Sequence, residues 1–240
     1  AMKLIVGFAS NSTAIINDGF NNLADSVVAL MAYIGSKLSK KPADRDHPHG
    51  HGRSESMVTL LVGILIIYVG VKLFITSISH FKDEPTINIT GITLLVLILS
   101  ILAKVYIYRL NRVLFRRLDS DLNLGVMVDA RNDIFMTSLI IVGAFVQKYV
   151  SFNLDAAIGV FLAVIIIIPG FSLFRENASY LMGKSVSDEV VKKIGDILLD
   201  SNFIVGYHNL EIHDYGKGHM DASVDVEIAE NLSLLVAHYI

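Results

Sequence analysis

Long apolar segments separated by short polar ones occupy the first three quarters of the chain. A helix of about 20 apolar residues is long enough to cross the hydrocarbon core of a lipid bilayer. Four segments approach or exceed this length, at residues 57–78, 89–108, 134–152 and 154–174. The pattern predicts an α-helical membrane protein that crosses the bilayer several times.

Two weaker segments precede these four. Residues 14–38 are apolar but are interrupted by amide and acidic side chains at Asn17, Asp18, Asn21, Asn22 and Asp25. Residues 3–9 are too short to span, and we interpret them as the end of a helix whose beginning is missing. With both segments the prediction is a six-helix transmembrane bundle with a truncated first helix. No basic stretch with a small-residue cleavage site is present, so we expect no signal peptide.

The charges of the connections predict the orientation. Residues 37–53 contain five basic residues and residues 109–117 contain four, whereas residues 80–90 and 147–155 contain one Lys each. Short connections rich in Lys and Arg remain in the cytoplasm. We therefore expect both basic connections and both chain termini to be cytoplasmic.

The pattern changes after about residue 183. The expected elements are a helix from Ser187 to Asp200, strands at residues 209–213 and 222–228 around a turn at residues 215–218, and a helix from Asn231. We therefore predict a transmembrane domain at residues 1–183. A small cytoplasmic αββα domain is expected at residues 184–240, incomplete at its C-terminal end.

Composition agrees with membrane residence and excludes several classes of function. Hydrophobic residues make up 53% of the chain and charged residues 18%, against about 25% charged in soluble domains. The absence of Cys removes disulfides, thiolate metal sites and cysteine nucleophiles. The formal charge of −3 gives no reason to expect nucleic acid as a partner. No nucleophile with a base at hydrogen-bonding spacing is visible, so an intramembrane hydrolase is not expected.

Polar residues at membrane depth give the strongest functional signal. Asn21 and Asp25 are four residues apart and share one face of a helix, and Asp129 and Asp133 have the same spacing on another predicted span. An acidic residue near the bilayer centre costs about 3 kcal/mol, so these side chains need compensation. A single buried Asp often serves only as an interhelical hydrogen-bonding residue. Two pairs favour a site of hard oxygen ligands for a divalent cation.

A second group lies in the connection at residues 42–53. Asp44, His47 and His51 are candidate ligands for a borderline metal, with His49 as a spare. The alternative is a solvated polar turn.

These segments resemble the cation diffusion facilitator family. Residues 10–25 resemble its second-helix motif, residues 42–55 its loop signature, Asp129-Ala-Arg-Asn-Asp133 its fifth-helix motif, and His213-Asp-Tyr-Gly a strand of its cytoplasmic domain. The segments occur in the family's order over nearly the whole chain.

The resemblance implies a homodimeric antiporter that exports divalent metal ions against protons and has the six-helix plus αββα architecture. It implies three metal sites with ligands Asn21, Asp25, Asp129 and Asp133 for transport, Asp44, His47 and His51 in the loop, and His213, Asp225 and His238 in the cytoplasmic domain. It also implies a charge interlock between Arg53 and Asp188 at the dimer junction, for which the alternative is a positive-inside arginine near the membrane surface.

The ligand set predicts the cargo. Zinc-transporting relatives place a His among the four transport positions, whereas this chain has only oxygen donors there, which suit Mn²⁺ better than Zn²⁺. The Asn–Asp and Asp–Asp pairs also resemble the manganese-exporting branch of the family. We expect Mn²⁺ first, then Fe²⁺ and Zn²⁺, and no organic cofactor. The alternatives are a zinc or iron exporter of the same fold and a non-transporting scaffold, which only Asn21 supports because it lowers the charge of the site.

Repulsion among the carboxylates of the transport site predicts that metal transport is coupled to protons. Three carboxylates packed at membrane depth disfavour full ionisation, so we expect at least one of Asp25, Asp129 and Asp133 to bind a proton when metal is absent. Metal entry would then release this proton. The expected location is the bacterial cytoplasmic membrane.

Overall fold

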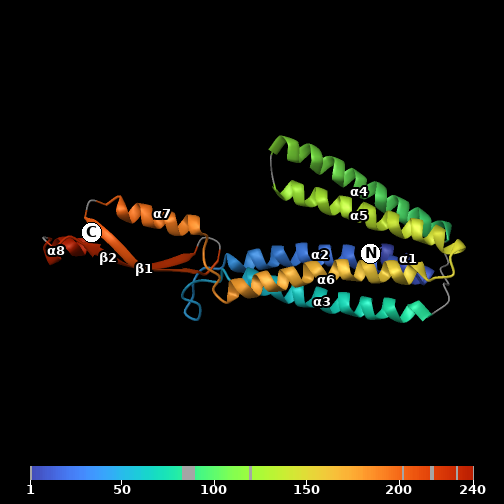
Figure 1. The fold of residues 1–240 in the computed structure, drawn as a ribbon, viewed down its shortest axis with the longest axis horizontal. Coiled ribbons are helices and arrows are strands. Elements are labelled where there is room, and N and C mark those ends of the chain that lie inside the picture. The colour runs from blue at the N-terminus through green and yellow to red at the C-terminus, as the bar shows by residue number, and fades with distance from the viewer. Residues whose placement is uncertain are drawn as a thin grey trace. The chain divides into compact units, whose positions relative to one another are not determined.

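The structure is a computed structural model that describes residues 2–82, 90–118, 121–201, 203–216, 219–230 and 232–239. The elements in chain order are α1 (Met2–Ser10), α2 (Thr13–Ser39), α3 (Ser54–Ser79), α4 (Gly91–Leu118), α5 (Asp121–Val146), α6 (Leu154–Leu181), α7 (Asp188–Leu199), β1 (Ile204–Asp214), β2 (Met220–Ile228) and α8 (Leu234–Tyr239) (Figure 1). The 3-10 helices η1 (His80–Lys82) and η2 (Gln147–Tyr149) extend the ends of α3 and α5.

Within the described residues, three helical stretches are long and apolar enough to cross a membrane: Ser54–Lys82, Gly91–Arg117 and Leu154–Leu181. Large apolar side chains point outward from them, and on α3 Leu65, Tyr68 and Ile75 are all more than half exposed. Such a surface is stable against lipid tails and not against water. Helices α2 and α5 are equally long, but charged and amide side chains interrupt them, so apolarity alone does not mark them as spans.

Helix α5 does not follow the apolar segment at residues 134–152 that marked this span in the sequence. It begins at Asp121, so Asp129 and Asp133 both lie within it, and it ends at Val146. Gln147 stabilises the break that follows, because its amide nitrogen donates to the carbonyls of Val150 at 3.1 Å and Phe152 at 2.8 Å. The apolar segment therefore contains both the end of α5 and a turn.

Residues 109–117 form the last turns of α4 and not the connection expected from their basic side chains. Arg116 and Arg117 lie in the final turn, where cations interact favourably with the helix macrodipole. Basic residues at this position thus extend the helix beyond the apolar segment.

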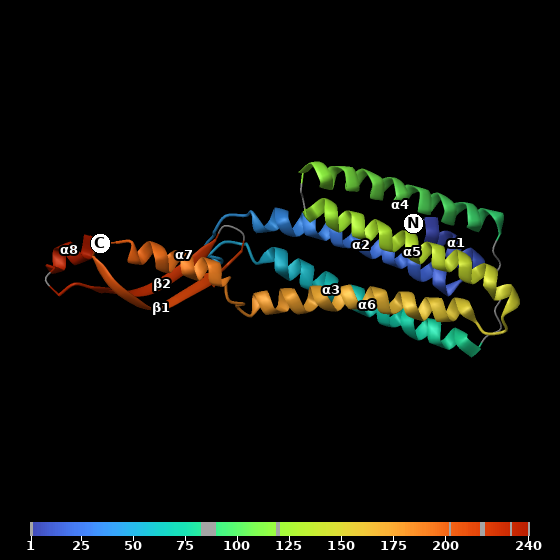
Figure 2. The ribbon, with the colours of Figure 1, turned by 45° about the horizontal axis from the view of Figure 1, so that its top comes forward.

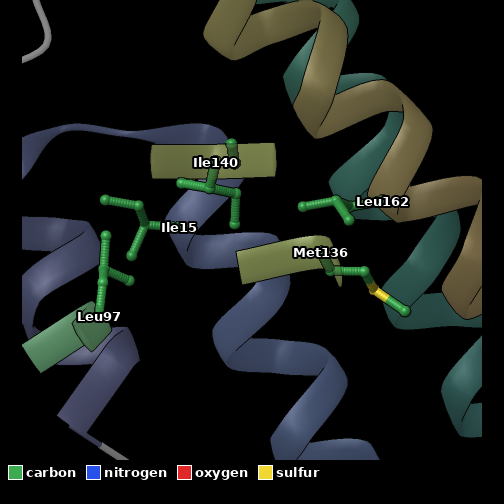
Figure 3. Close-up of a cluster of buried hydrophobic side chains, with 6 residues drawn as sticks. Ile15, Leu97, Met136, Ile140 and Leu162 are labelled. Carbon is green, nitrogen blue, oxygen red and sulfur yellow. The ribbon is translucent and has the colours of Figure 1, made fainter. Parts of the chain in front are cut away.

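The chain divides into two compact units, residues 1–29 with 62–173 and residues 30–61 with 174–240. In the first unit, α4 and α5 lie side by side (Figures 1 and 2). Its core is an apolar cluster that includes Ile15 of α2, Leu97 of α4, Met136 and Ile140 of α5 and Leu162 of α6 (Figure 3). The cluster joins these four helices.

A buried ion pair connects α1, α2 and α5. The Lys3 ammonium lies 2.7 Å from the Asp18 carboxylate and donates to the Thr137 hydroxyl at 2.9 Å. Thr137 in turn donates to Asp18 at 3.1 Å. Asp18 is fully buried and Lys3 is 7% exposed, so each charge depends on the other for compensation.

Asp155, in the first turn of α6, binds the N-terminus of α2. Its carboxylate accepts hydrogen bonds from the Ser12 hydroxyl at 2.5 Å, the Thr13 backbone N–H at 2.6 Å and the Thr13 hydroxyl at 2.8 Å. The first N–H groups of a helix have no partner within the helix. Asp155 satisfies them from outside, and its charge suits the positive ends of both α2 and α6.

In the second unit, α7, β1, β2 and α8 follow one another in the predicted order. Ser187 precedes α7 in an extended conformation, as expected for the residue before a helix. The antiparallel strands are longer than the segments at residues 209–213 and 222–228. Part of the predicted turn, residues 217–218, and the predicted helix start at Asn231 lie outside the described residues.

Candidate metal-binding sites

The four residues expected at the transport site lie on two helices. Asn21 and Asp25 are one turn apart on α2, and Asp129 and Asp133 are one turn apart on α5. Asp133 is buried at 2% exposure, Asn21 is partly buried, and Asp25 and Asp129 are exposed. The set therefore has one enclosed carboxylate and two accessible ones.

Contacts join the two pairs. The Asn21 amide nitrogen donates to the Asp133 carboxylate at 3.3 Å, and Asp25 interacts electrostatically with both Asp129 and Asp133. Among the described acidic and histidine side chains, these carboxylates do not form a cluster as tight as the loop group below. The arrangement offers oxygen donors from both helices to a cation that would draw them closer.

Lys104 contacts one of these carboxylates, although its position in the sequence does not assign it to them. It lies on α4, and its ammonium group forms an ion pair with the Asp133 carboxylate. Lysine within an apolar span usually marks a buried partner or a functional pathway. The signal in the sequence was a lone charge within the segment at residues 89–108, but the sequence does not identify its partner.

Asp44, His47 and His51 come together in the connection between α2 and α3, with one ligand atom from each within 4.8 Å of the others. Asp44 accepts the His47 backbone N–H at 2.8 Å, and its carboxylate lies 3.4 Å from His51 Nε2. The other ring nitrogen of His51 is 3.2 Å from the Pro42 carbonyl. Such a contact orients the ring so that Nε2 faces the carboxylate, as in metal-binding histidines.

The Asp44 carboxyl is held in its charged form. A hydrogen bond from the Lys41 ammonium at 2.8 Å, followed by the His47 backbone N–H, holds the pKa of Asp44 below its usual range. Hydrogen bonds to the charged form favour ionisation. Asp44 therefore remains a carboxylate across the physiological range and is the negatively charged member of the loop group.

His49 faces a different partner. Its Nδ1 atom lies 2.8 Å from the Asp221 carboxylate of β2, and its ring stacks on Tyr215 with centroids 4.3 Å apart. The structure thus separates His49 from the loop group, although its position in the sequence made it a spare ligand.

The same loop packs against the hairpin turn within the second unit. The Arg53 guanidinium donates to the Asp214 carbonyl through Nε at 3.2 Å and Nη2 at 3.0 Å, and lies 4.8 Å from the Tyr215 ring centroid. Within the part of a single chain that the structure describes, Arg53 thus contacts the hairpin turn, and its interlock with Asp188 at a dimer junction stays a prediction. A Cβ atom at Gly52 would lie 2.8 Å from Gly216 Cα, so the close approach requires glycine.

The residues expected at the cytoplasmic-domain site are distributed over the hairpin and α8. In the strand register, His213 lies opposite Asp221 and His208 lies opposite Asp225. The Asp225 carboxylate accepts a hydrogen bond from the Asn209 amide nitrogen at 2.8 Å. His238 lies on α8. His208, whose Nδ1 is 3.3 Å from Glu227, is the histidine opposite Asp225 and was missed. Counting strand positions outward from the turn would have placed Asn209 opposite Asp225, because the register shifts between His208 and Glu211.

Replacing His51 with alanine should weaken Zn²⁺ binding to the loop by on the order of 100-fold, because one of three ligands is lost. Isothermal titration measures the effect, in purified protein that carries Asp25→Ala to remove an expected ligand of the transport site. His49→Ala is the matched control, since His49 contacts Asp221 in place of Asp44. Equal loss in both variants would contradict the assignment of His51 as the ligand.

Comparison with known proteins identifies the family. Residues 1–182 match the family model described as the cation efflux transmembrane domain. A relative from Methanocaldococcus jannaschii, named an uncharacterized transporter, is 26% identical, with 99% of this chain and 83% of the relative aligned. The manganese efflux system protein MneS of Bacillus subtilis is 25% identical over 99% of this chain and 81% of its own length. The cation-efflux pump FieF of Citrobacter koseri is 23% identical over 100% of this chain and 79% of its own length.

This chain therefore belongs to the cation efflux, or cation diffusion facilitator, family and is an integral membrane protein of a transporter class. The family resemblance drawn from the motifs at residues 10–25, 42–55 and 129–133 is confirmed.

Proposed function

We propose that this protein exports Mn²⁺ in exchange for protons, as a homodimer that alternates access across the bacterial cytoplasmic membrane. The observation that carries the proposal is the oxygen-only set of Asn21, Asp25, Asp129 and Asp133, with Asn21 bonded to Asp133 across α2 and α5. Two relatives from Bacillus subtilis, MneS and MneP, are named manganese efflux proteins, which supports manganese as the cargo.

Ligand chemistry supports this choice of metal. Carboxylate and amide oxygens suit Mn²⁺, whereas imidazole nitrogen favours Zn²⁺. The imidazoles of the loop group, His47 and His51, therefore belong to a separate role, in which a borderline metal at Asp44, His47 and His51 acts outside the transport path. His213, Asp225 and His238 of the cytoplasmic domain are proposed as a further metal site.

Carboxylate repulsion supports exchange with protons. Asp25, Asp129 and Asp133 interact electrostatically, and a divalent cation that binds among them displaces protons by compensating their charge. Release on the far side lets protons return. In this proposal residues 1–183 form the transport domain, residues 184–240 form the cytoplasmic domain, and both termini are cytoplasmic.

Metal uptake into everted vesicles tests the proposal. With the vesicle interior acidified, we expect accumulation of Mn²⁺ to exceed that of Fe²⁺ and Zn²⁺, and dissipation of the pH gradient by an ionophore to abolish it. A preference for Zn²⁺ or Fe²⁺ would support the alternative exporters of the same fold. Mn²⁺ uptake that is indifferent to the pH gradient would reject exchange with protons.

A further inference from the structure

The contact between Lys104 and Asp133 places a positive charge inside the proposed transport site. Lys104 reaches Asp133 from α4, the neighbour of α5 (Figure 2). The Asp133 side chain is 3% exposed and that of Lys104 is 24% exposed, so the ion pair is largely shielded from solvent. Attraction between opposite charges is strongest in such surroundings.

Both oxygens of this carboxylate are engaged. The Lys104 ammonium contacts Oδ2, and the Asn21 amide nitrogen donates to Oδ1. A metal ion bound by Asp133 needs an oxygen lone pair on the same carboxylate. Each carboxylate oxygen has a second lone pair, but a metal ion at Asp133 would lie beside the Lys104 ammonium, and repulsion between the two cations makes them compete for this carboxylate.

We propose that Lys104 is a tethered cation that competes with the cargo ion for Asp133. It occupies the carboxylate while the site is empty and withdraws when metal binds. This inference rests on the proposed function, because that function makes Asp133 a metal ligand. Lys104 acts here as a fixed positive charge, and its role requires no proton transfer.

The balance of charge explains what such a competitor contributes. When fully ionised, Asp25, Asp129 and Asp133 carry three negative charges, and the Lys104 ammonium compensates one of them while it lies against Asp133. Transport also requires that the ion bind weakly enough to leave. By stabilising the empty state, Lys104 lowers the affinity for metal and assists release.

A purely structural tie between α4 and α5 predicts a different result. If Lys104 only held the helices together, its removal would disturb the site and weaken metal binding. The competitor makes the opposite prediction, because its removal frees the Asp133 carboxylate. The sign of the change in Mn²⁺ affinity distinguishes the two.

The test is Mn²⁺ titration of the purified full chain in detergent, following free Mn²⁺ by electron paramagnetic resonance, in a His47→Ala/His51→Ala background. Lys104→Met is expected to tighten Mn²⁺ binding on the order of tenfold. Lys104→Arg keeps the charge and should leave the affinity near that of the background. Lys72→Met is the matched control, because Lys72 is a span lysine whose ammonium lies over the Tyr68 ring, 5.7 Å from its centroid.

The proposal would be overturned if the Lys104→Met protein elutes as a single species and binds Mn²⁺ with unchanged or weaker affinity. If Lys104→Met does not fold, Lys104→Gln is measured against the same criterion. Asp133→Asn should abolish the gain from Lys104→Met, and a gain that persists would also overturn it. Failure of the proposed function is seen separately, as Mn²⁺ binding that Asp133→Asn does not alter when Lys104 is intact.

Discussion

Replacing Asp25 with alanine is expected to reduce Mn²⁺ uptake by everted vesicles to the level of vesicles without the protein. The variant removes one of three carboxylates from the proposed transport site, and a hard cation loses both a ligand and a compensating charge. The Asp25 side chain is exposed, so its truncation leaves no buried cavity and should not impair folding.

The control for this variant lies one residue further along α2. Ser26 is also exposed, and its hydroxyl donates to the Asn22 carbonyl of the same helix at 2.9 Å. Ser26→Ala should transport Mn²⁺ at the original rate. Substantial Mn²⁺ uptake by Asp25→Ala, at equal protein content, would show that the acidic pairs are not the transport ligands.

The second large effect concerns stability. Asp155→Ala should lower the free energy of unfolding by about 3 kcal/mol, because it leaves buried donors of Ser12 and Thr13 without an acceptor. For a chain of this length, such a loss corresponds to a decrease in Tm of about 10 °C. This shift is measured by heating the protein in detergent and monitoring its unfolding by size-exclusion chromatography.

Two further variants show whether the charge of Asp155 matters. Asp155→Asn keeps the shape and one acceptor oxygen, so its Tm should lie between those of the original protein and Asp155→Ala. Tyr149→Ala changes an 89% exposed side chain before α6 and should leave the Tm unchanged. A Tm for Asp155→Ala that equals that of Tyr149→Ala would exclude a stabilising role for the carboxylate.

The sequence was informative where spacing alone determines which side chains share a face. Four-residue spacing was sufficient to pair Asn21 with Asp25 and Asp129 with Asp133, because both pairs lie within helices. Hydrophobicity was a poor guide to the limits of α5. The apolar segment begins only at residue 134 because the first half of α5 contains polar residues. A helix can nevertheless continue through polar side chains that have polar neighbours.

Spacing and hydrophobicity patterns do not predict which residues from distant segments contact each other. Helix α4 is apolar on most of its surface, so nothing in the sequence indicates that Lys104 faces Asp133. The partner of Asp225 depends on strand register, and a β-bulge at Asn209, whose φ is 52°, shifts that register. Lys104 and His208 therefore became visible only once the segments were placed together.

The buried contact of Lys3, Asp18 and Thr137 has a mechanical consequence for alternating access. Drawing α1 away from α2 would leave an uncompensated charge in apolar surroundings, at a cost of about 3–5 kcal/mol, whereas moving α5 would break only the hydrogen bonds of Thr137. Helices α1 and α2 are consequently expected to move together during transport, and α5 follows them as long as the hydrogen bonds of Thr137 persist.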